Sequence, residues 1–291
     1  MSRERPDAGM QKLPAGVHWT RRVGNRVAIG ACVLATAIVV LPLALLIVRL
    51  LESGLRDLSL DFFLHMPKPV GELGGGMANA IVGTLIVVGI GAVIAVPVGV
   101  AAGVYLAEYG RERLTTVVRY TADVLAGAPS IVVGVAVFGL LVVPMGRFSA
   151  LAGGVALAVL MLPTIVRATE EVVRLVPASY RQAALALGAP SWVATMRVVL
   201  PAARAGVTTA ALLAVARASG ETAPLLFTAL GNRFWTTRVD QPIATLPVMI
   251  YDYARAPYSD WNAQAWTGAL TLLVLVTVLS ALMRVATQRI R

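Results

Sequence analysis

Long uncharged apolar runs dominate this chain. They occupy residues 27–48, 77–107, 124–146, 148–166 and 263–283. A further apolar segment, residues 205–232, is interrupted by Arg217 and Glu221. A helix needs about 20 predominantly apolar residues to cross the hydrocarbon core of a bilayer. The pattern therefore predicts an all-α, polytopic membrane protein with six transmembrane helices.

The composition supports a membrane location. Hydrophobic residues make up 58% of the 291 residues, and charged residues make up only 14%. Average soluble domains carry roughly 25% charged residues. A single apolar run could be a buried helix of a globular protein, but six such runs leave no room for a large soluble domain.

The distribution of basic residues predicts the orientation. If the N-terminus lies inside, the inner segments carry 17 of the 25 Lys and Arg residues, and the outer segments carry 7. Lys and Arg accumulate on the cytoplasmic side of membrane proteins, so both termini are expected in the cytoplasm. The same bias explains the net charge of +10. Nucleic-acid binding is not indicated, because the basic residues do not cluster on one segment.

The runs divide the chain into an ordered series of segments. The first run is too long for the apolar core of a cleaved signal peptide, which has about 7–15 residues, so we interpret it as an anchor. The expected segments are a cytoplasmic N-terminal tail (1–26), a first transmembrane helix (27–51), an outer loop (52–76), a core of five transmembrane helices (77–285) and a cytoplasmic tail (286–291). Within the core we expect a semi-polar hairpin at 176–201 and an outer loop at 233–262.

A semi-polar segment, residues 180–201, separates two of the apolar runs. It predicts two short helices at the membrane surface, of the kind that touches a soluble partner. Its residues follow a spaced pattern: Gln182-Ala183-Ala184, three residues, Gly188, nine residues, and then Val-Val-Leu-Pro at 198–201.

The clearest chemical signal inside an apolar segment is Arg217 and Glu221. Residues four apart lie on one face of a helix. Charged groups at membrane depth cost roughly 2.5–3.5 kcal/mol each and usually face the bundle interior or a water path. Gly220 and Pro224 predict a bent or broken helix at this level. A substrate pathway that includes Arg217, Glu221 and Thr222 is one interpretation, and a neutralised Arg–Glu pair that only holds the bundle together is the other.

Arg167 lies at the inner end of the fourth run. It is either an interfacial residue that extends to the headgroups or part of the inner mouth of a path. Two arginines along a path would favour an anion, because a guanidinium stays charged and matches phosphate oxygens in a bidentate manner.

Catalysis by this chain itself is not indicated. Cys32 has no partner cysteine, and His18 and His65 are isolated in different loops. No G-x-x-x-x-G-K-[ST] phosphate loop occurs. We therefore expect no metal, no catalytic residue and no cofactor in this chain; the family resemblance described next implies that ATP and Mg²⁺ are bound by a partner.

Several segments together resemble one family. They are Gly83-Thr84-Leu85 and residues 105–109, 125–134, 148–153, 162–171 and 216–226. With the spacing at 182–201, they resemble the PstA-type permease subunits of bacterial phosphate ABC importers. The coupling motif of importer permeases has Glu where this chain has Gln182.

The resemblance implies a fold and a set of partners. It implies a type I ABC importer permease, a transport subunit rather than an enzyme, in the bacterial cytoplasmic membrane. The implied partners are a sister permease subunit, a dimer of ATP-binding subunits inside, an external phosphate-binding protein and the surrounding lipid. The implied substrate pathway uses Arg167, Arg217, Glu221 and Thr222.

The resemblance also assigns the hairpin to the ATPase contact. Gln182, Ala183, Ala184, Leu187 and Gly188 would couple this chain to the ATPase, with an apolar contact face formed by Ala183, Ala184 and Leu187. Two other functions stay open at this point. One is a permease for another oxyanion, such as sulfate or molybdate, and the other is a non-conducting signalling or scaffold subunit.

Overall fold

The computed structural model describes residues 15–72, 74–110 and 112–288. Within these ranges the regular elements are all helical, which confirms the all-α prediction. Contacts divide the chain into two compact units, which meet between Leu51 and Glu52.

The first unit consists mainly of one long helix, α1 (Ala15–Arg56), which continues a few residues into the second unit. The helix extends beyond the predicted span 27–51 at both ends. Residues 15–26, which the sequence places in the tail, continue this helix. Residues 1–14 of the predicted tail lie outside the described residues.

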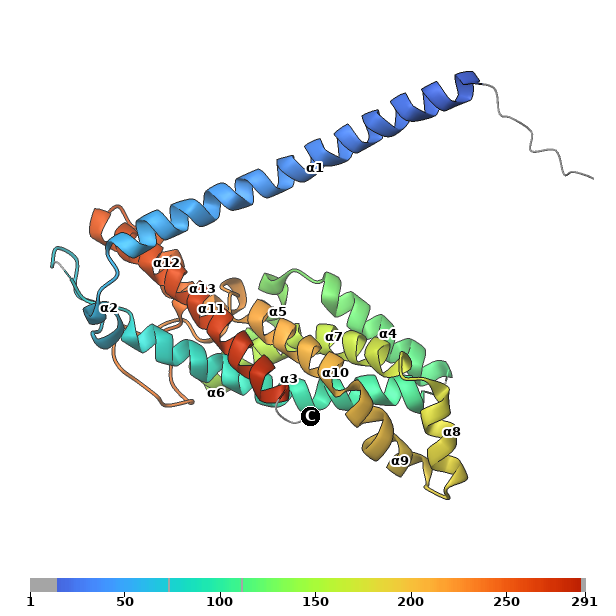
Figure 1. Ribbon diagram of the computed structural model, residues 1–291. Coiled ribbons are helices and arrows are strands. Elements are labelled where there is room, and N and C mark those ends of the chain that lie inside the picture. The colour runs from blue at the N-terminus through green and yellow to red at the C-terminus, as the bar shows by residue number, and fades with distance from the viewer. Residues whose placement is uncertain (1–14, 73, 111, 289–291) are drawn as a thin grey trace, which may run out of the picture. The chain divides into compact units, whose positions relative to one another are not determined.

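The second unit is a bundle built on four long helices. These are α3 (Ala78–Glu108), α7 (Ala150–Arg174), α10 (Leu200–Ala218) and α13 (Ser259–Gln288). Figure 1 shows a hairpin of short helices at one end of this bundle, with α2 (Leu60–Leu64) and α12 (Leu246–Arg255) at the opposite end.

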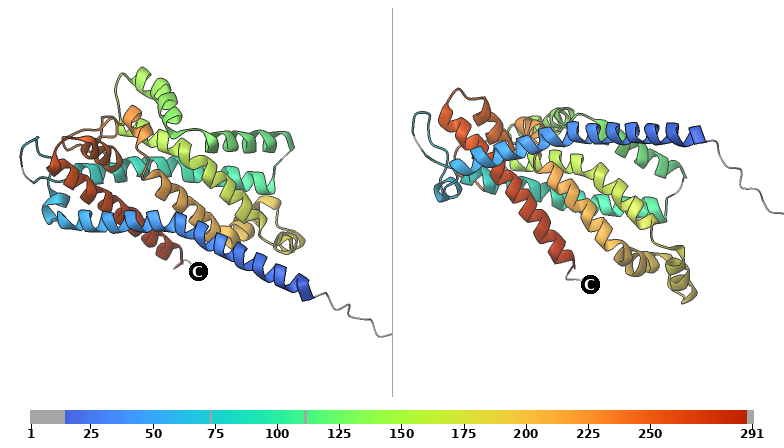
Figure 2. Two further views of the ribbon diagram at one scale, coloured as in Figure 1. Left: turned by 90° about the horizontal axis from the view of Figure 1, so that it is seen from above. Right: turned by 45° about the horizontal axis from the view of Figure 1, so that its top comes forward.

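The predicted third span is broken. Residues 124–146 form one apolar run, yet helix α4 (Glu112–Gly127) ends within this run and α5 (Ser130–Val137) starts in a new direction. Helix α5 is continued by η1 (Phe138–Val142) and α6 (Val143–Met145). The two halves are bent by 107°. Pro129 lacks an N–H and disfavours helical geometry in the residue before it, which explains the break at Ala128–Pro129. Figure 2 shows the two arms.

The break changes the count of membrane spans. In the described part of the chain, 5 helices are long and apolar enough to cross a membrane. The predicted number of six is reached only if the bent pair α4–α5 counts as one span.

Small residues allow α3 and α7 to approach closely. A Cβ atom added to Gly154 would lie 2.4 Å from Cγ2 of Ile90, and one added to Gly103 would lie 2.6 Å from Cβ of Thr169. Lipid gives helices no hydrophobic reason to associate, so close van der Waals contact between small residues takes that role. The α3–α7 pair is therefore the rigid centre of the bundle.

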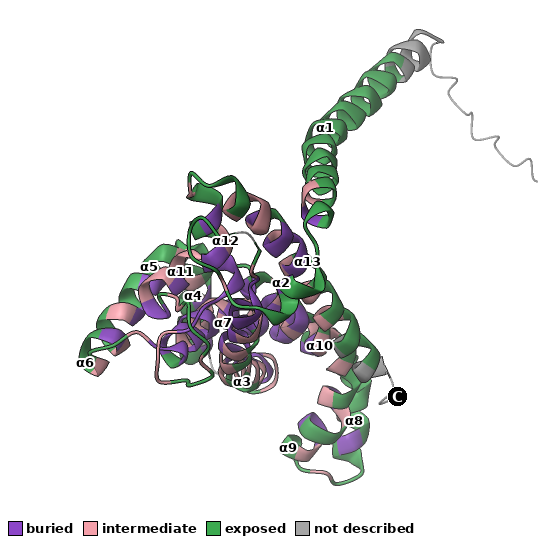
Figure 3. Cartoon of the chain, turned by 90° about the vertical axis from the view of Figure 1, so that its left-hand side faces the viewer, coloured by how far each residue is buried: buried purple, intermediate pink, exposed green. Residues whose placement is uncertain are grey.

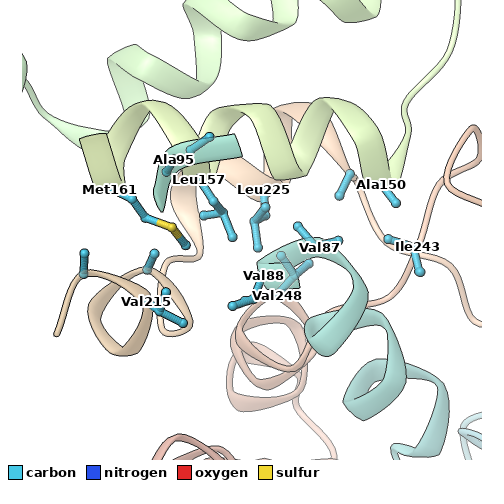
Figure 4. Close-up of a cluster of buried hydrophobic side chains, with 14 of the residues drawn as sticks. Val87, Val88, Ala95, Ala150, Leu157, Met161, Val215, Leu225, Ile243 and Val248 are labelled. Carbon is cyan, nitrogen blue, oxygen red and sulfur yellow. The ribbon is translucent and has the colours of Figure 1, made fainter. Parts of the chain in front are cut away.

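The buried core surrounds this pair. Figure 4 shows Val87 and Val88 of α3 beside Leu157 and Met161 of α7, with side chains from neighbouring helices. Figure 3 shows buried residues concentrated on the central helices, while the hairpin at one end is largely exposed. Helix α7 is therefore the central helix of the core, and the neighbouring helices pack against it.

The predicted outer loop 233–262 is not a simple loop. It contains α12 and the first residues of α13. Leu246, Met249 and Tyr253 form the buried side of α12, and Leu246 N–H donates to Oγ1 of Thr84 at 2.8 Å. Burial of one face therefore stabilises a helix in a segment for which the sequence predicts a loop.

Candidate functional site

The helix that carries Arg217 is broken directly after this residue. Helix α10 ends at Ala218, and α11 (Ala223–Thr228) begins after a short non-helical stretch that contains Glu221. Pro224 lies in the first turn of α11, where its missing N–H costs little. The predicted break at Gly220 and Pro224 is confirmed.

Two helix breaks meet at one cavity. Its volume is about 260 Å³. The lining comes from the α4–α5 break, from α7, from the end of α10 and from Glu221, and consists of Leu125, Ala126, Ala128, Pro129, Ser130, Leu160, Pro163, Thr164, Ala214, Arg217, Ala218 and Glu221. Non-helical backbone is tolerated at membrane depth where it lines a cavity, and both helix breaks meet this condition.

Close packing of α5 on α11 holds the two breaks together. A Cβ atom added to Gly134 of α5 would lie 2.6 Å from Cα of Pro224. Glycine at this position lets the two helices touch, and the start of α5 at Ser130 then faces the cavity. The N-terminus of a helix carries partial positive charge, so this end adds to the positive potential of Arg217.

Arg217 and Glu221 share the cavity without forming an ion pair. Across the described residues, no carboxylate oxygen lies within 4.0 Å of the Arg217 guanidinium. Arg217 is exposed and Glu221 is half-buried. The structure therefore does not support the interpretation in which the two charges only neutralise each other.

Thr222 is not part of the cavity lining. It is the residue before α11 and makes no side-chain capping hydrogen bond. Of the predicted pathway residues, the structure brings together Arg217 and Glu221 and places Thr222 beside them on the backbone.

Arg167 lies about one turn of α7 beyond Thr164, outside the cavity wall. Its Nε donates to Oδ1 of Asp123 at 3.0 Å, and a second nitrogen of its guanidinium donates to Oδ2. A third nitrogen lies 3.6 Å from Oε2 of Glu170. The guanidinium is thus engaged by carboxylates of α4 and α7 rather than extended toward headgroups.

A buried carboxylate that the sequence analysis did not single out organises this region. The Glu170 side chain is 5% exposed, and its Oε1 accepts from Nε of Arg119 at 2.8 Å and lies 2.9 Å from Arg174. Together with Arg167, three arginines surround one carboxylate. The signal was present as Glu170-Glu171 after an apolar run, but only the fold shows that Glu170 turns inward.

The short helices predicted for the hairpin are present as α8 (Ala178–Ala186), α9 (Ser191–Ala194) and η2 (Thr195–Val199). Arg181 fastens it to the bundle. Arg181 Nε donates to both oxygens of Glu108 at 2.8 and 2.9 Å, and its terminal nitrogens donate to the carbonyls of Val173 and Val176 at 3.0 and 2.9 Å. The hairpin therefore has a charged attachment to the ends of α3 and α7.

The exposed face of the hairpin differs from the predicted one. Gln182, Ala183 and Leu187 are exposed, and Leu187 is 88% exposed. Ala184 is buried, so it does not belong to the apolar contact face that we predicted. Helix α8 packs on α9 and η2 of the same hairpin. Gly188 has a φ of +82°, the left-handed conformation that ends helices and favours glycine.

Comparisons with known proteins agree with this fold. The profile of the family described as "Binding-protein-dependent transport system inner membrane component" matches residues 99–291. The chain is 42% identical over 268 residues to the phosphate transport system permease protein PstA of Haemophilus influenzae, covering 92% of this chain and 94% of the relative. It is 48% identical to the PstA of Xylella fastidiosa (strain Temecula1), covering 79% of this chain and 81% of the relative.

A solved structure shares the architecture. A chain of the MetNI methionine ABC transporter in inward-facing conformations has a TM-score of 0.57, with 22% identity, and the match covers 72% of this chain and 92% of that chain. At this identity the likeness concerns the fold alone. By profile and by sequence identity, the chain belongs to the family of binding-protein-dependent transport system inner membrane components, and it is a multi-pass membrane permease subunit rather than an enzyme.

Proposed function

We propose that this chain is the permease subunit of an ATP-driven importer that moves inorganic phosphate across the cytoplasmic membrane. The observation that carries the proposal is the cavity at the two helix breaks, where Arg217 has no carboxylate partner among the residues that the structure describes. An uncompensated guanidinium at membrane depth is costly, and an anionic substrate would offset that cost. The relatives named as phosphate transport permeases support this substrate.

The second charge in the cavity favours phosphate over sulfate. Phosphate near neutral pH carries at least one P–O–H group, whereas sulfate and molybdate carry none. Glu221 lines the same cavity as Arg217, and an ionised carboxylate only accepts hydrogen bonds. Glu221 can therefore accept from protonated phosphate, but it repels an oxyanion that has no proton.

The proposal assigns the remaining work to partners. A sister permease would complete the path, and an external phosphate-binding protein would deliver the substrate. A dimer of ATP-binding subunits would bind ATP and Mg²⁺ and hydrolyse the ATP. The bias of Lys and Arg toward the hairpin side supports an orientation with both termini in the cytoplasm. No nucleic acid is part of this assembly.

The hairpin is the proposed contact with the ATPase. Leu187 and Trp192 are large apolar side chains that are 88% and 62% exposed on it, and exposed apolar groups of this kind mark docking surfaces when they cluster. Gln182 lies exposed on the same element and can hydrogen-bond to the ATPase, but it cannot form the ion pair that a glutamate would.

The test is phosphate uptake by the reconstituted four-component complex with Arg217→Gln. We expect uptake to be lost while the complex still assembles, because the cavity loses its positive charge. Arg204→Gln is the matched control, since Arg204 lies on the same helix but not at the cavity. Wild-type uptake by Arg217→Gln would refute the pathway role.

Two further measurements separate the alternatives. If sulfate or molybdate competes with labelled phosphate as well as unlabelled phosphate does, the substrate is another oxyanion or oxyanions in general. If the complex with the wild-type chain transports no oxyanion at all, the chain is a signalling or scaffold subunit.

A further inference from the structure

Two carboxylates compete for Arg167, and they differ sharply in their surroundings. Glu170 is 5% exposed and is also bound by Arg119 and Arg174. Asp123 is 58% exposed, and within the described residues its side chain pairs only with Arg167. The carboxylate of Glu170 is therefore held in place by several partners, whereas the carboxylate of Asp123 is open to solvent on one side.

The Asp123–Arg167 pair lies directly beyond the proposed substrate cavity. On α7, Thr164 lines the cavity and Arg167 follows about one turn later. On α4, Ala126 lines the cavity and Asp123 precedes it by about one turn. Both helices thus lead from the cavity to this pair on the way to the hairpin end of the bundle.

The two carboxylates should respond differently to a competing anion. Removing a partner from a buried ion pair leaves an uncompensated charge and is strongly unfavourable. A pair between exposed groups contributes little and exchanges easily with solvent ions. An arriving anion can therefore displace Asp123 from Arg167, whereas Glu170 stays bound to its three arginines.

We infer that Asp123 is a built-in competitor for the substrate at Arg167. This inference rests on the proposed function, because the competing anion is inorganic phosphate on its way out of the cavity. Phosphate takes the place of the Asp123 carboxylate on the guanidinium, and Asp123 then returns and expels it. The carboxylate thereby lowers the affinity of the inner end of the path and opposes rebinding of phosphate from the cytoplasm.

A purely structural role for the pair makes a different prediction. If Asp123 served only to hold α4 against α7, its loss would weaken assembly and reduce transport at every phosphate concentration. The Arg119–Glu170 pair already connects the same two helices through a buried carboxylate, so the Asp123 contact is not needed for that purpose.

The experiment measures inhibition by phosphate on the inner side. The complete complex is reconstituted in vesicles with ATP and a graded concentration of unlabelled phosphate in the lumen, and uptake of labelled phosphate is measured from outside. For Asp123→Asn we expect half-inhibition at a lumenal phosphate concentration about 5-fold lower than for wild type, a change equivalent to about 1 kcal/mol. The external phosphate concentration for half-maximal uptake should stay unchanged.

The controls assign the effect to this pair. Asp123→Glu keeps the charge and should behave like wild type. Asp240→Asn removes a half-buried carboxylate that is bound by Arg238 and Arg147 away from the cavity, and should not alter inner inhibition. In the double variant Asp123→Asn with Arg167→Gln, the added sensitivity to lumenal phosphate should disappear.

The outcomes distinguish this inference from the proposed function. Absence of phosphate uptake by the wild-type complex would refute the function itself. With uptake intact, an unchanged inhibition curve for Asp123→Asn would overturn the inference, and so would failure of that variant to assemble, since the pair would then be structural. Persistence of the added sensitivity in the double variant would also overturn it.

Discussion

Removal of the Arg181 side chain tests whether the hairpin moves with the bundle. In the structure, this one guanidinium binds both oxygens of Glu108 and the carbonyls of Val173 and Val176. It therefore connects α8 to the last turn of α3 and to the end of α7. We expect Arg181→Ala to loosen the hairpin without unfolding the bundle, because the α3–α7 packing does not involve it.

The magnitude follows from the burial of the partner. The Glu108 side chain is 9% exposed and that of Arg181 is 25% exposed. Removing one partner of a buried pair costs about 3–5 kcal/mol. The partial exposure of Arg181 lets water reach the vacated site and places the cost at the lower limit, about 3 kcal/mol. A change of this size corresponds to a more than 100-fold rise in the population of detached hairpin.

Hydrogen exchange in the assembled complex is the direct assay. Amides of residues 178–199 should exchange faster in Arg181→Ala by up to this factor, while those of α3 and α7 away from the hairpin should not change. The number of phosphate ions moved per ATP hydrolysed should fall in the same variant. Arg197→Ala is the control, because Arg197 is an exposed arginine of the same hairpin that forms no ion pair with the described residues.

A double-mutant cycle with Glu108→Gln decides the cause. If the two groups act as a pair, the double variant should be only slightly looser than either single variant. Additive effects of the two substitutions, or equal loosening by Arg197→Ala, would refute the reasoning.

Three further predictions concern packing, backbone conformation and charge. Gly103→Ala should lower the thermal unfolding midpoint of the complex by several degrees, because the added Cβ would lie 2.6 Å from an α7 side chain. Gly89→Ala is its control and should have no effect, because a Cβ added at Gly89 would have no neighbouring atom within 4 Å. Gly188→Val should reduce transport per ATP hydrolysed more than Gly188→Asn, since asparagine tolerates the positive φ of +82° better. Glu170→Gln should cost about 3–5 kcal/mol and reduce the yield of assembled complex on size-exclusion chromatography, while Glu171→Gln, at an exposed position, should not.

Much of the fold follows from local signals in the sequence. The apolar runs predict the long helices, and Gly220 with Pro224 predicts the break after Arg217. Pro129 carried the same kind of signal, but the uncharged residues on both sides of it favoured one continuous span. The apolar pattern does not predict the 107° bend, because it shows which residues can lie in lipid but not the direction in which the chain runs.

The charged contacts could not be predicted from one sequence. Arg167 and Asp123 are 44 residues apart, and Arg181 and Glu108 are 73 residues apart. The first pairing depends on how α4 packs on α7, and the second depends on where α8 lies beside the end of α3. The burial of Ala184 has the same origin, because the sequence alone does not say which side of a short surface helix packs on the rest of the chain. The roles of the pathway and coupling residues stay predictions that transport assays must test.

The exposed position of Arg217 has a consequence for the biogenesis of the protein. The newly inserted chain carries this side chain as a charge at membrane depth, which costs roughly 2.5–3.5 kcal/mol. If the proposed sister subunit covers Arg217, association removes that penalty and the cost becomes a driving force for pairing. An orphan copy would stay marked by the same guanidinium, a recognisable defect for the proteases that remove unassembled membrane subunits. On the proposed function, one side chain thus links the selectivity of the finished transporter to the quality control of its parts.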